Sequence, residues 1–269
     1  MTRLEVPGAR LSYEVRGAGP VMVMISGASG AGAGFTEIAD LLSDQFTVVT
    51  YDRRGFSQSE LTGAQDRDHR LETDVNDVFR VIQHFGHGGS TVVYGASSGA
   101  IIVLELIATH PERIRCVIAH EPPLMMLLSE GRKWIEFFRT LYGVYRESGP
   151  EAALDQFYGR VFPESDARTV AHMPKSEQAK RNSIYWFELE LRQYPAVPPP
   201  VHALKPQSER VVLTAGRKSK GHPAGEATFE LGKLIDRSVL ELPGGHLGPL
   251  SSPAEYAARL IQAVQELGS

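Results

Sequence analysis

The stretch T-V-V-Y-G-A-S-S-G, residues 91–99, decides the fold. A β-branched run leads directly into a serine flanked by glycines, and residues 98–110 continue as an apolar helical pattern. A G-x-S-x-G turn between strand and helix strains its central residue, so small residues must stand two positions away. Such a turn raises the hydroxyl of Ser97 above the sheet edge and leaves the N–H of Ser98 free at the helix start. The stretch therefore predicts Ser97 as a nucleophile and the Ser98 N–H as an oxyanion donor. The alternative is a tight turn without chemistry.

Strand and helix patterns alternate on both sides of this turn. The expected strands are Leu11–Val15, Val21–Ile25, Phe46–Tyr51, Ser90–Tyr94, Arg115–His120, Arg210–Leu213 and Val239–Leu242. The expected helices are Phe35–Asp44, Asp68–Phe85, Ser98–His110, Gly225–Ile235 and Pro253–Leu267. This alternation requires crossover connections, so it predicts an α/β fold with a mostly parallel sheet and helices on both faces.

Residues 124–205 interrupt the alternation, because they carry aromatic-rich helical patterns and no strand signal. We expect a core formed by residues 1–123 and 206–269, with residues 124–205 inserted as a helical lid or cap. Four lid side chains are candidates for lining a substrate pocket: Met125, Leu128, Tyr185 and Trp186. Such side chains also commonly form the core between a lid and a sheet, and this alternative stays open.

Four segments together resemble the α/β-hydrolase fold family over nearly the whole chain. They are I-S-G-A-S-G (25–30), Y-D-R-R-G-F-S-Q-S (51–59), G-A-S-S-G (95–99) and P-G-G-H (243–246). The resemblance implies a sheet of the eight-stranded type, with the lid inserted after the sixth strand. It also implies serine-hydrolase chemistry without a cofactor or a metal.

The first of these segments often carries His-Gly and an oxyanion-hole residue in this family, and Ser26 stands at the histidine position here. The resemblance assigns the second oxyanion donor to the backbone N–H of Ala28; a glycine-rich loop without catalytic duty is the alternative. The 51–59 segment is usually structural in the family. Asp52, Arg53 and Arg54 are therefore expected to support a loop and are left outside the catalytic set.

The general base is expected late in the chain, because the family order is nucleophile, acid and histidine. His246 lies in L-P-G-G-H-L-G-P, residues 242–249, between the last expected strand and the last helix. The glycines allow this loop to fold over the sheet edge toward Ser97. His246 would take the proton of Ser97 and return it to the leaving group; a surface histidine is the alternative.

The acid is not at its usual position. That position matches Ser219, in the loop T-A-G-R-K-S-K-G-H-P (214–223), which contains no carboxylate. Glu121 follows the neighbouring strand directly and precedes two prolines, so it is the preferred acid. Glu226 or Asp236 is a second possibility. In the third, Ser219 or a water supports the histidine without a charge.

Other polar residues near the expected sheet edge have simpler interpretations. His120 should face away from Glu121 and pack in the core, and His222 should face solvent. The basic cluster Arg217, Lys218 and Lys220 is either a solvated loop or a rim that attracts an anionic substrate.

Composition excludes several classes of partner. The chain has 269 residues, 42% hydrophobic and 22% charged, which suits one large domain. A net charge of -4 gives no reason to expect nucleic acid or an anionic membrane as partner. We find no signal-peptide pattern and no apolar run of membrane-spanning length. A lone cysteine, Cys116, lies in an apolar run, so we expect a buried core residue and a reducing, cytoplasmic location.

The expected function is hydrolysis of a small-molecule ester, lactone or thioester through a Ser97 acyl-enzyme. The same site could instead support C–C bond hydrolysis, haloperoxidase-like or lyase chemistry. A ligand-binding or sensor protein without catalysis also remains open, because Ser219 stands at the usual acid position. The sequence does not determine whether the protein is a monomer or a homo-oligomer.

Overall fold

The computed structural model describes residues 2–86, 90–173 and 175–267. Residues 1, 87–89 and 268–269 of the predicted core and residue 174 of the predicted lid lie outside the described residues.

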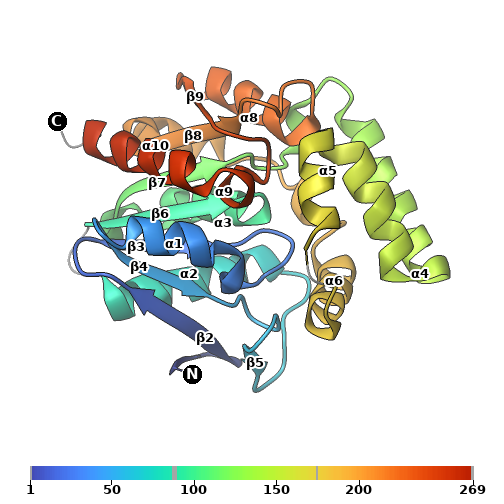
Figure 1. Cartoon of the computed structure of the whole chain (residues 1–269), viewed down its shortest axis with the longest axis horizontal. Helices are drawn as coiled ribbons and strands as arrows, with labels where there is room; N and C mark the ends of the chain where they lie inside the picture. The colour runs from blue at the N-terminus through green and yellow to red at the C-terminus, as the bar shows by residue number, and fades with distance from the viewer. Residues whose placement is uncertain (1, 87–89, 174, 268–269) are drawn as a thin grey trace.

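A mixed sheet runs through the centre of the molecule in the order β1-β2-β4-β3-β6-β7-β8-β9, and β5 pairs only with β2 (Figure 1). All pairings of β2 are antiparallel, and the strands from β4 to β9 along this order are parallel to one another. The predicted fold class is therefore confirmed. The strands are β1 (Thr2–Val6), β2 (Ala9–Arg16), β3 (Val21–Ile25), β4 (Thr47–Tyr51), β5 (Glu60–Leu61), β6 (Thr91–Ala96), β7 (Ile114–His120), β8 (Val211–Gly216) and β9 (Val239–Leu242).

Helices cover both faces of the sheet, so its central strands are apolar on both sides. In β3, Met22 and Met24 join the cluster under α1 and α10, whereas Val23 and Ile25 join the opposite cluster under α2, α3 and α8. The helices of the core are α1 (Thr36–Leu42), α2 (Arg70–Phe85), α3 (Ser98–Thr109), α8 (Pro223–Leu234), α9 (Gly248–Ser251) and α10 (Pro253–Glu266), with short 3-10 turns η1 (Gly32–Phe35) and η2 (Pro111–Arg113).

A helix-rich segment separates β7 from β8 and stands beside the sheet at the right of Figure 1. Its elements are η3 (Met125–Leu127), α4 (Gly131–Val161), α5 (Glu164–Ala171), α6 (Glu177–Leu189), η4 (Tyr194–Ala196), α7 (Val201–Leu204) and η5 (Lys205–Arg210). The long helix α4 is kinked at Gly149, whose φ is +88°, immediately before Pro150. Aromatic side chains of α4 and α6 form a third apolar cluster with Phe56 and Met125.

Two strands were not predicted from the sequence. β1 is an edge strand with only Val6 fully buried, so charged Arg3 and Glu5 obscure any apolar alternation. β5 has only two residues, both exposed. The predicted strands β3, β4, β6, β7, β8 and β9 agree with the structure to within a few residues, and all but the last are short runs buried on both faces.

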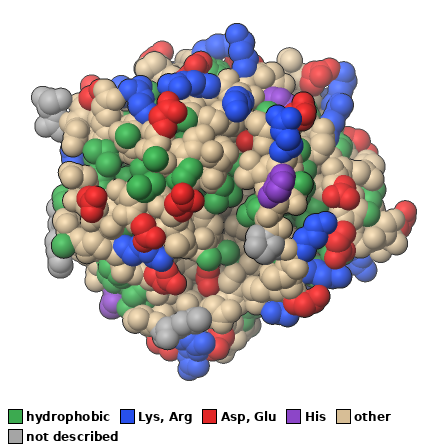
Figure 2. All heavy atoms as spheres, in the orientation of Figure 1, with side chains coloured by type: hydrophobic (Ala, Val, Ile, Leu, Met, Phe, Trp, Pro, Cys, Tyr) green, Lys and Arg blue, Asp and Glu red, His purple; other side chains and the backbone are tan. Residues whose placement is uncertain are grey.

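The surface carries both signs of charge. Figure 2 shows Lys and Arg side chains interspersed with Asp and Glu over the face in view. No helix within the described ranges combines the length and the apolarity that a membrane crossing requires.

Candidate active site

Ser97 occupies a strained turn between β6 and α3. Its φ is +56° and its ψ is -121°, a conformation that residues with a side chain rarely adopt. A Cβ on Gly95 would come within 2.2 Å of the Gly99 carbonyl oxygen, so the turn needs glycine at this position. The Ser97 N–H donates to the carbonyl of His120, at 2.9 Å, which ties the turn to the end of β7.

Two backbone segments flank Ser97. Ser98 begins α3, is buried, and lines the cavity beside Ser97. On the other side, a Cβ on Gly27 would lie 2.7 Å from the Ser97 Cβ, so the loop after β3 packs directly against the serine. Ala28 is the next residue of that loop and is half-buried.

His246 lies in the loop between β9 and α9, and only 6% of its side chain is exposed. Its Nδ1 is 2.6 Å from the Oε2 of Glu121. The other carboxylate oxygen, Oε1, accepts the N–H of Gly216 at 2.7 Å. The two predicted residues thus meet at the sheet edge, 125 positions apart in the chain.

Glu121 follows β7 with a φ of +48°, and its own N–H donates to the Thr214 carbonyl at 3.0 Å. The side chain is 1% exposed. Burial alone would raise the pKa of this carboxyl, but the hydrogen bond and positive charge of His246 outweigh burial and hold the pKa at about 2. Glu121 is therefore an anion throughout the neutral range.

The alternative acids lie elsewhere. Glu226 accepts the N–H of Gly221 at 2.8 Å in the first turn of α8, and Asp236 is exposed after that helix. Ser219 is buried, and its hydroxyl contributes to the low pKa of Glu121 without making a regular hydrogen bond to any described residue. It therefore neighbours the acid and does not replace it.

His120 is fully buried and contacts the loop that carries His246. Its Nε2 lies 3.2 Å from the carbonyl oxygen of His246, and its Nδ1 lies 3.0 Å from the Thr214 hydroxyl. Burial lowers the pKa of His120 to about 4, so the ring is neutral at pH 7. A carbonyl only accepts, so Nε2 carries the proton and Nδ1 accepts from Thr214. His222 is half-buried just before α8.

Ser97, Ser98 and His246 line one enclosed cavity of about 30 Å³, which is room for about two water molecules. Met125 and Trp186, two of the four pocket candidates, lie in its wall. Leu128 and Tyr185 do not line this cavity. Successive residues of a helix are about 100° apart, so Tyr185 points away from the direction of Trp186, and its hydroxyl accepts a hydrogen bond from Arg70 at 3.1 Å. Leu128 lines a separate shallow surface pocket before α4. The rest of the cavity wall is Pro123, Phe138, Phe157, Val161, Phe162, Glu190, Leu191, Tyr194, Pro195 and Ala224.

Three residues near His246 were missed from the sequence. Phe162 packs on the imidazole with ring centroids 4.7 Å apart. Asp166 of α5 is fully buried, and its Oδ2 accepts the Leu247 N–H at 3.2 Å; burial raises its pKa. Glu190 shares only the cavity with His246; it caps the end of α6 four residues after Trp186, and this spacing was a signal that could have identified it.

The basic cluster points to solvent. Arg217, Lys218 and Lys220 are exposed, none of them lines the cavity, and Arg217 pairs with Glu255 at 3.1 Å. Cys116 is buried in the sheet, and burial raises the pKa of its thiol to about 11, so it is an inert core residue. Across the described ranges, His, Cys, Asp and Glu side chains form no group of three or more that could hold a metal ion.

Comparison with known proteins agrees with this architecture. The family model described as "alpha/beta hydrolase fold" matches residues 20–248. An uncharacterised hydrolase of Bacillus subtilis, YraK, is 31% identical over 269 residues, covering 98% of this chain and 95% of the relative. A thermophilic esterase from Thermogutta terrifontis superposes with a TM-score of 0.78 at 18% identity, over 100% of both chains. An enol-lactonase from Burkholderia xenovorans superposes with a TM-score of 0.70 at 17% identity, over 98% of this chain and 100% of that one.

Proposed function

Because the chain belongs to the alpha/beta hydrolase fold family, we propose that it is a serine hydrolase that cleaves an ester, lactone or thioester. One observation carries this proposal: His246, whose Nδ1 lies 2.6 Å from the buried carboxylate of Glu121, lines the same cavity as Ser97. No cofactor takes part in the proposed reaction.

In this mechanism Glu121 accepts the Nδ1–H of His246 and so fixes the tautomer whose Nε2 lone pair is free. Nε2 takes the hydroxyl proton as the Oγ of Ser97 attacks the carbonyl carbon of the substrate. The backbone N–H groups of Ala28 and Ser98 stabilise the negative oxygen that forms. His246 then gives the proton to the leaving group, and an acyl-enzyme remains on Ser97. Water then attacks the acyl-enzyme while Nε2 of His246 takes a proton from it. His246 returns this proton to the Oγ of Ser97, and the acid product leaves.

We assign the acid to Glu121, and both of its oxygens support the assignment. Oε1 is held by the Gly216 N–H and Oε2 faces His246, so the carboxylate cannot turn away from the imidazole. A low pKa keeps it charged while His246 cycles between its neutral and protonated forms. This is the role that an acid in a serine hydrolase has to fill.

The cavity wall favours an apolar acyl group, because most of the side chains around Ser97 are aliphatic or aromatic. Its volume of about 30 Å³ corresponds to about two water molecules. We therefore propose that residues 124–205 act as a lid, and that aromatic side chains such as Phe157 and Trp186 move when substrate enters. Both belong to the helix-rich segment.

A fluorophosphonate probe and a p-nitrophenyl ester assay test this function. We expect the wild type to be labelled once and to turn over ester, and Ser97→Ala to lose both properties. Ser238→Ala is the matched control, because Ser238 is exposed between α8 and β9. A wild type that is neither labelled nor active would reject the serine hydrolase and favour a ligand-binding protein.

A further inference from the structure

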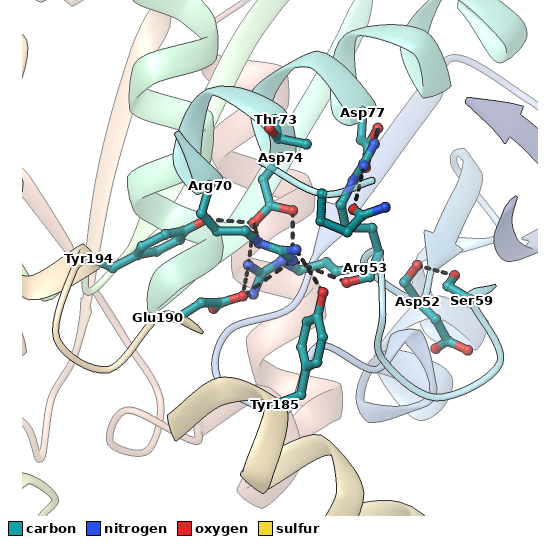
Figure 3. A network of polar contacts seen from close by, with 12 residues as sticks. Asp52, Arg53, Ser59, Arg70, Thr73, Asp74, Asp77, Tyr185, Glu190 and Tyr194 are labelled. Carbon is teal, nitrogen blue, oxygen red and sulfur yellow. Dashed lines mark hydrogen bonds and ion pairs between the residues drawn. The ribbon is translucent and has the colours of Figure 1, made fainter. Parts of the chain in front are cut away.

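Four charged side chains are buried together between the loop after β4, helix α2 and the end of α6 (Figure 3). Arg53 is at their centre and is 0% exposed. Its Nη2 donates to Asp74 and to Glu190, both at 2.6 Å, and its Nη1 donates to the second oxygen of Glu190 at 3.1 Å. Arg70 pairs with the same two carboxylates, so two positive charges face two negative ones.

The ionisation of this group follows from its geometry. Burial opposes charge on both carboxylates. Arg53 and Arg70 outweigh it at Asp74 and lower the pKa of that group, whereas at Glu190 burial outweighs them and raises the pKa. Burying four charges is costly, and apolar replacements of a buried ion pair are often at least as stable. Stability alone is therefore a weak reason for this arrangement. The hydrogen bonds between the four charged side chains and other parts of the chain indicate its role better.

One such bond goes to the loop beside Ser97. The Nη1 of Arg53 donates to the carbonyl oxygen of Gly27 at 3.0 Å. The backbone of Arg53 holds the same loop, because its N–H donates to the Gly30 carbonyl at 2.8 Å. The turn is closed by the Gly30 N–H, which donates to the Gly27 carbonyl at 2.9 Å. Arg53 thus holds both ends of a four-residue turn that packs against Ser97.

The peptide bond explains what this contact does. The carbonyl of Gly27 and the N–H of Ala28 belong to one planar trans unit, so they point in opposite directions. A guanidinium that fixes the carbonyl therefore fixes the direction of the Ala28 N–H. Hydrogen bonds in a chain also polarise one another, so a charged donor on the carbonyl strengthens the N–H as a donor.

We propose that Arg53 is a positioning residue of the oxyanion hole: it orients and polarises the Gly27–Ala28 peptide, and Asp74 and Glu190 hold its guanidinium in place. This inference rests on the proposed serine-hydrolase function. It gives the arginine of the 51–59 segment a role in the reaction beyond support of a loop. Asp52 keeps the supporting role, since its carboxylate accepts the N–H groups of Gly32 and Gln58 at 2.9 and 3.0 Å.

The chain provides a matched control one residue away. Arg54 is also buried and forms a two-pronged pair with Asp77, with both contacts at 2.7 Å. Its other hydrogen bonds go to Gln65 and to the Pro7 carbonyl, away from the loop beside Ser97. Removing either pair deletes one arginine and one carboxylate charge from the interior, and only the Arg53 pair touches the Gly27 peptide.

The experiment compares Arg53→Met/Glu190→Gln with Arg54→Met/Asp77→Asn, after thermal unfolding has established that both are folded. In the first variant we expect kcat for p-nitrophenyl acetate to fall about 30- to 1,000-fold, with KM changed less than about threefold. Binding of a trifluoromethyl ketone, which forms a tetrahedral adduct, should weaken by a similar factor. The Arg54 variant should keep kcat within about threefold of the wild type. Glu190→Gln alone should lower kcat less than the double variant does, because Arg53 keeps its bond to Gly27 and Asp74 still holds the guanidinium.

Arg53→Lys keeps the charge balance and serves if the double variant does not fold. One ammonium nitrogen replaces two guanidinium nitrogens, so we expect an intermediate loss of kcat. The role of Arg53 would be overturned by wild-type kcat in both Arg53 variants, or by equal losses of kcat in the Arg53 and Arg54 double variants. Fluorophosphonate labelling of Ser97 in the wild type would still support the proposed function in either case. A wild type without labelling or turnover would overturn both.

Discussion

Replacing Glu121 with glutamine tests the acid with the smallest change in shape. The glutamine carbonyl can still accept the Gly216 N–H, a contact of 2.7 Å in the wild type. Its NH₂ group would then face the Nδ1 of His246, where the carboxylate oxygen lies at 2.6 Å. An NH₂ donates, so it selects the tautomer that carries its proton on Nε2. That imidazole cannot accept the proton of Ser97.

The size of the effect follows from this change of tautomer. The equivalent acid-to-amide change in a Ser-His-Asp triad lowers kcat by about 10⁴. We expect a loss of about 10³ to 10⁴ in kcat here, which corresponds to about 4 to 5.5 kcal/mol of transition-state stabilisation. KM should change little, because Glu121 lies behind His246 and not in the cavity wall.

Steady-state hydrolysis of p-nitrophenyl acetate measures both constants, and fluorophosphonate titration counts the functional sites. Glu226→Gln is the matched control, because Glu226 caps a nearby turn and should be replaceable within about twofold in kcat. Adding Ser219→Asp to the Glu121→Gln variant should recover at least about tenfold, since Ser219 is buried beside the acid at the family's usual position. A Glu121→Gln enzyme with kcat within tenfold of the wild type would refute the assignment of the acid.

Three further predictions concern stability and the cavity. The folded pKa of Glu121 is about 2 and its ordinary value is 4.5, so its ionised form stabilises the fold by about 3 kcal/mol above pH 4.5. In urea unfolding, the advantage of the wild type over Glu121→Gln should disappear as the pH falls from 4.5 to 2, and a constant difference would contradict this. Asp166 has the opposite sign, because burial raises its pKa: the wild type should lose stability relative to Asp166→Asn as the pH rises above about 4, and a difference that does not change with pH would contradict this. Trp186→Ala should cost about 3–5 kcal/mol of stability and shift the preference in kcat/KM by about tenfold toward longer p-nitrophenyl acyl chains; an unchanged chain-length profile would remove Trp186 from the acyl pocket.

The local sequence pattern was sufficient to predict the strands of the central sheet and the turn that holds Ser97. The strand, turn and helix around Ser97 are contiguous in the sequence, and the turn leaves little choice of residue. The contact of Glu121 with His246 was predictable for a different reason. Parallel strands end at a common edge, so a carboxylate directly after β7 and a glycine-rich loop directly after β9 meet there.

Contacts made by the helix-rich segment could not be predicted in the same way. A helical pattern indicates which side chains share a face, but the docking of the helix decides which face meets the cavity. For this reason two adjacent residues have different surroundings: Trp186 lines the cavity, and Tyr185 contacts Arg70. The partners of Arg53 include Glu190, 137 residues away, and neither the motif at 51–59 nor the spacing in α6 identifies that pair.

The position of Glu121 after β7 has a consequence for protein engineering. The loop after β8 supplies no residue of the proposed triad, and its path is set by main-chain bonds from Arg217 to Leu242 and from Lys218 to Gly244, at 2.8 and 2.9 Å. The side chains at 217, 218 and 220 project into solvent. These three positions can be randomised, or used to attach a surface or a reporter, while the buried contact of Glu121 with His246 stays intact.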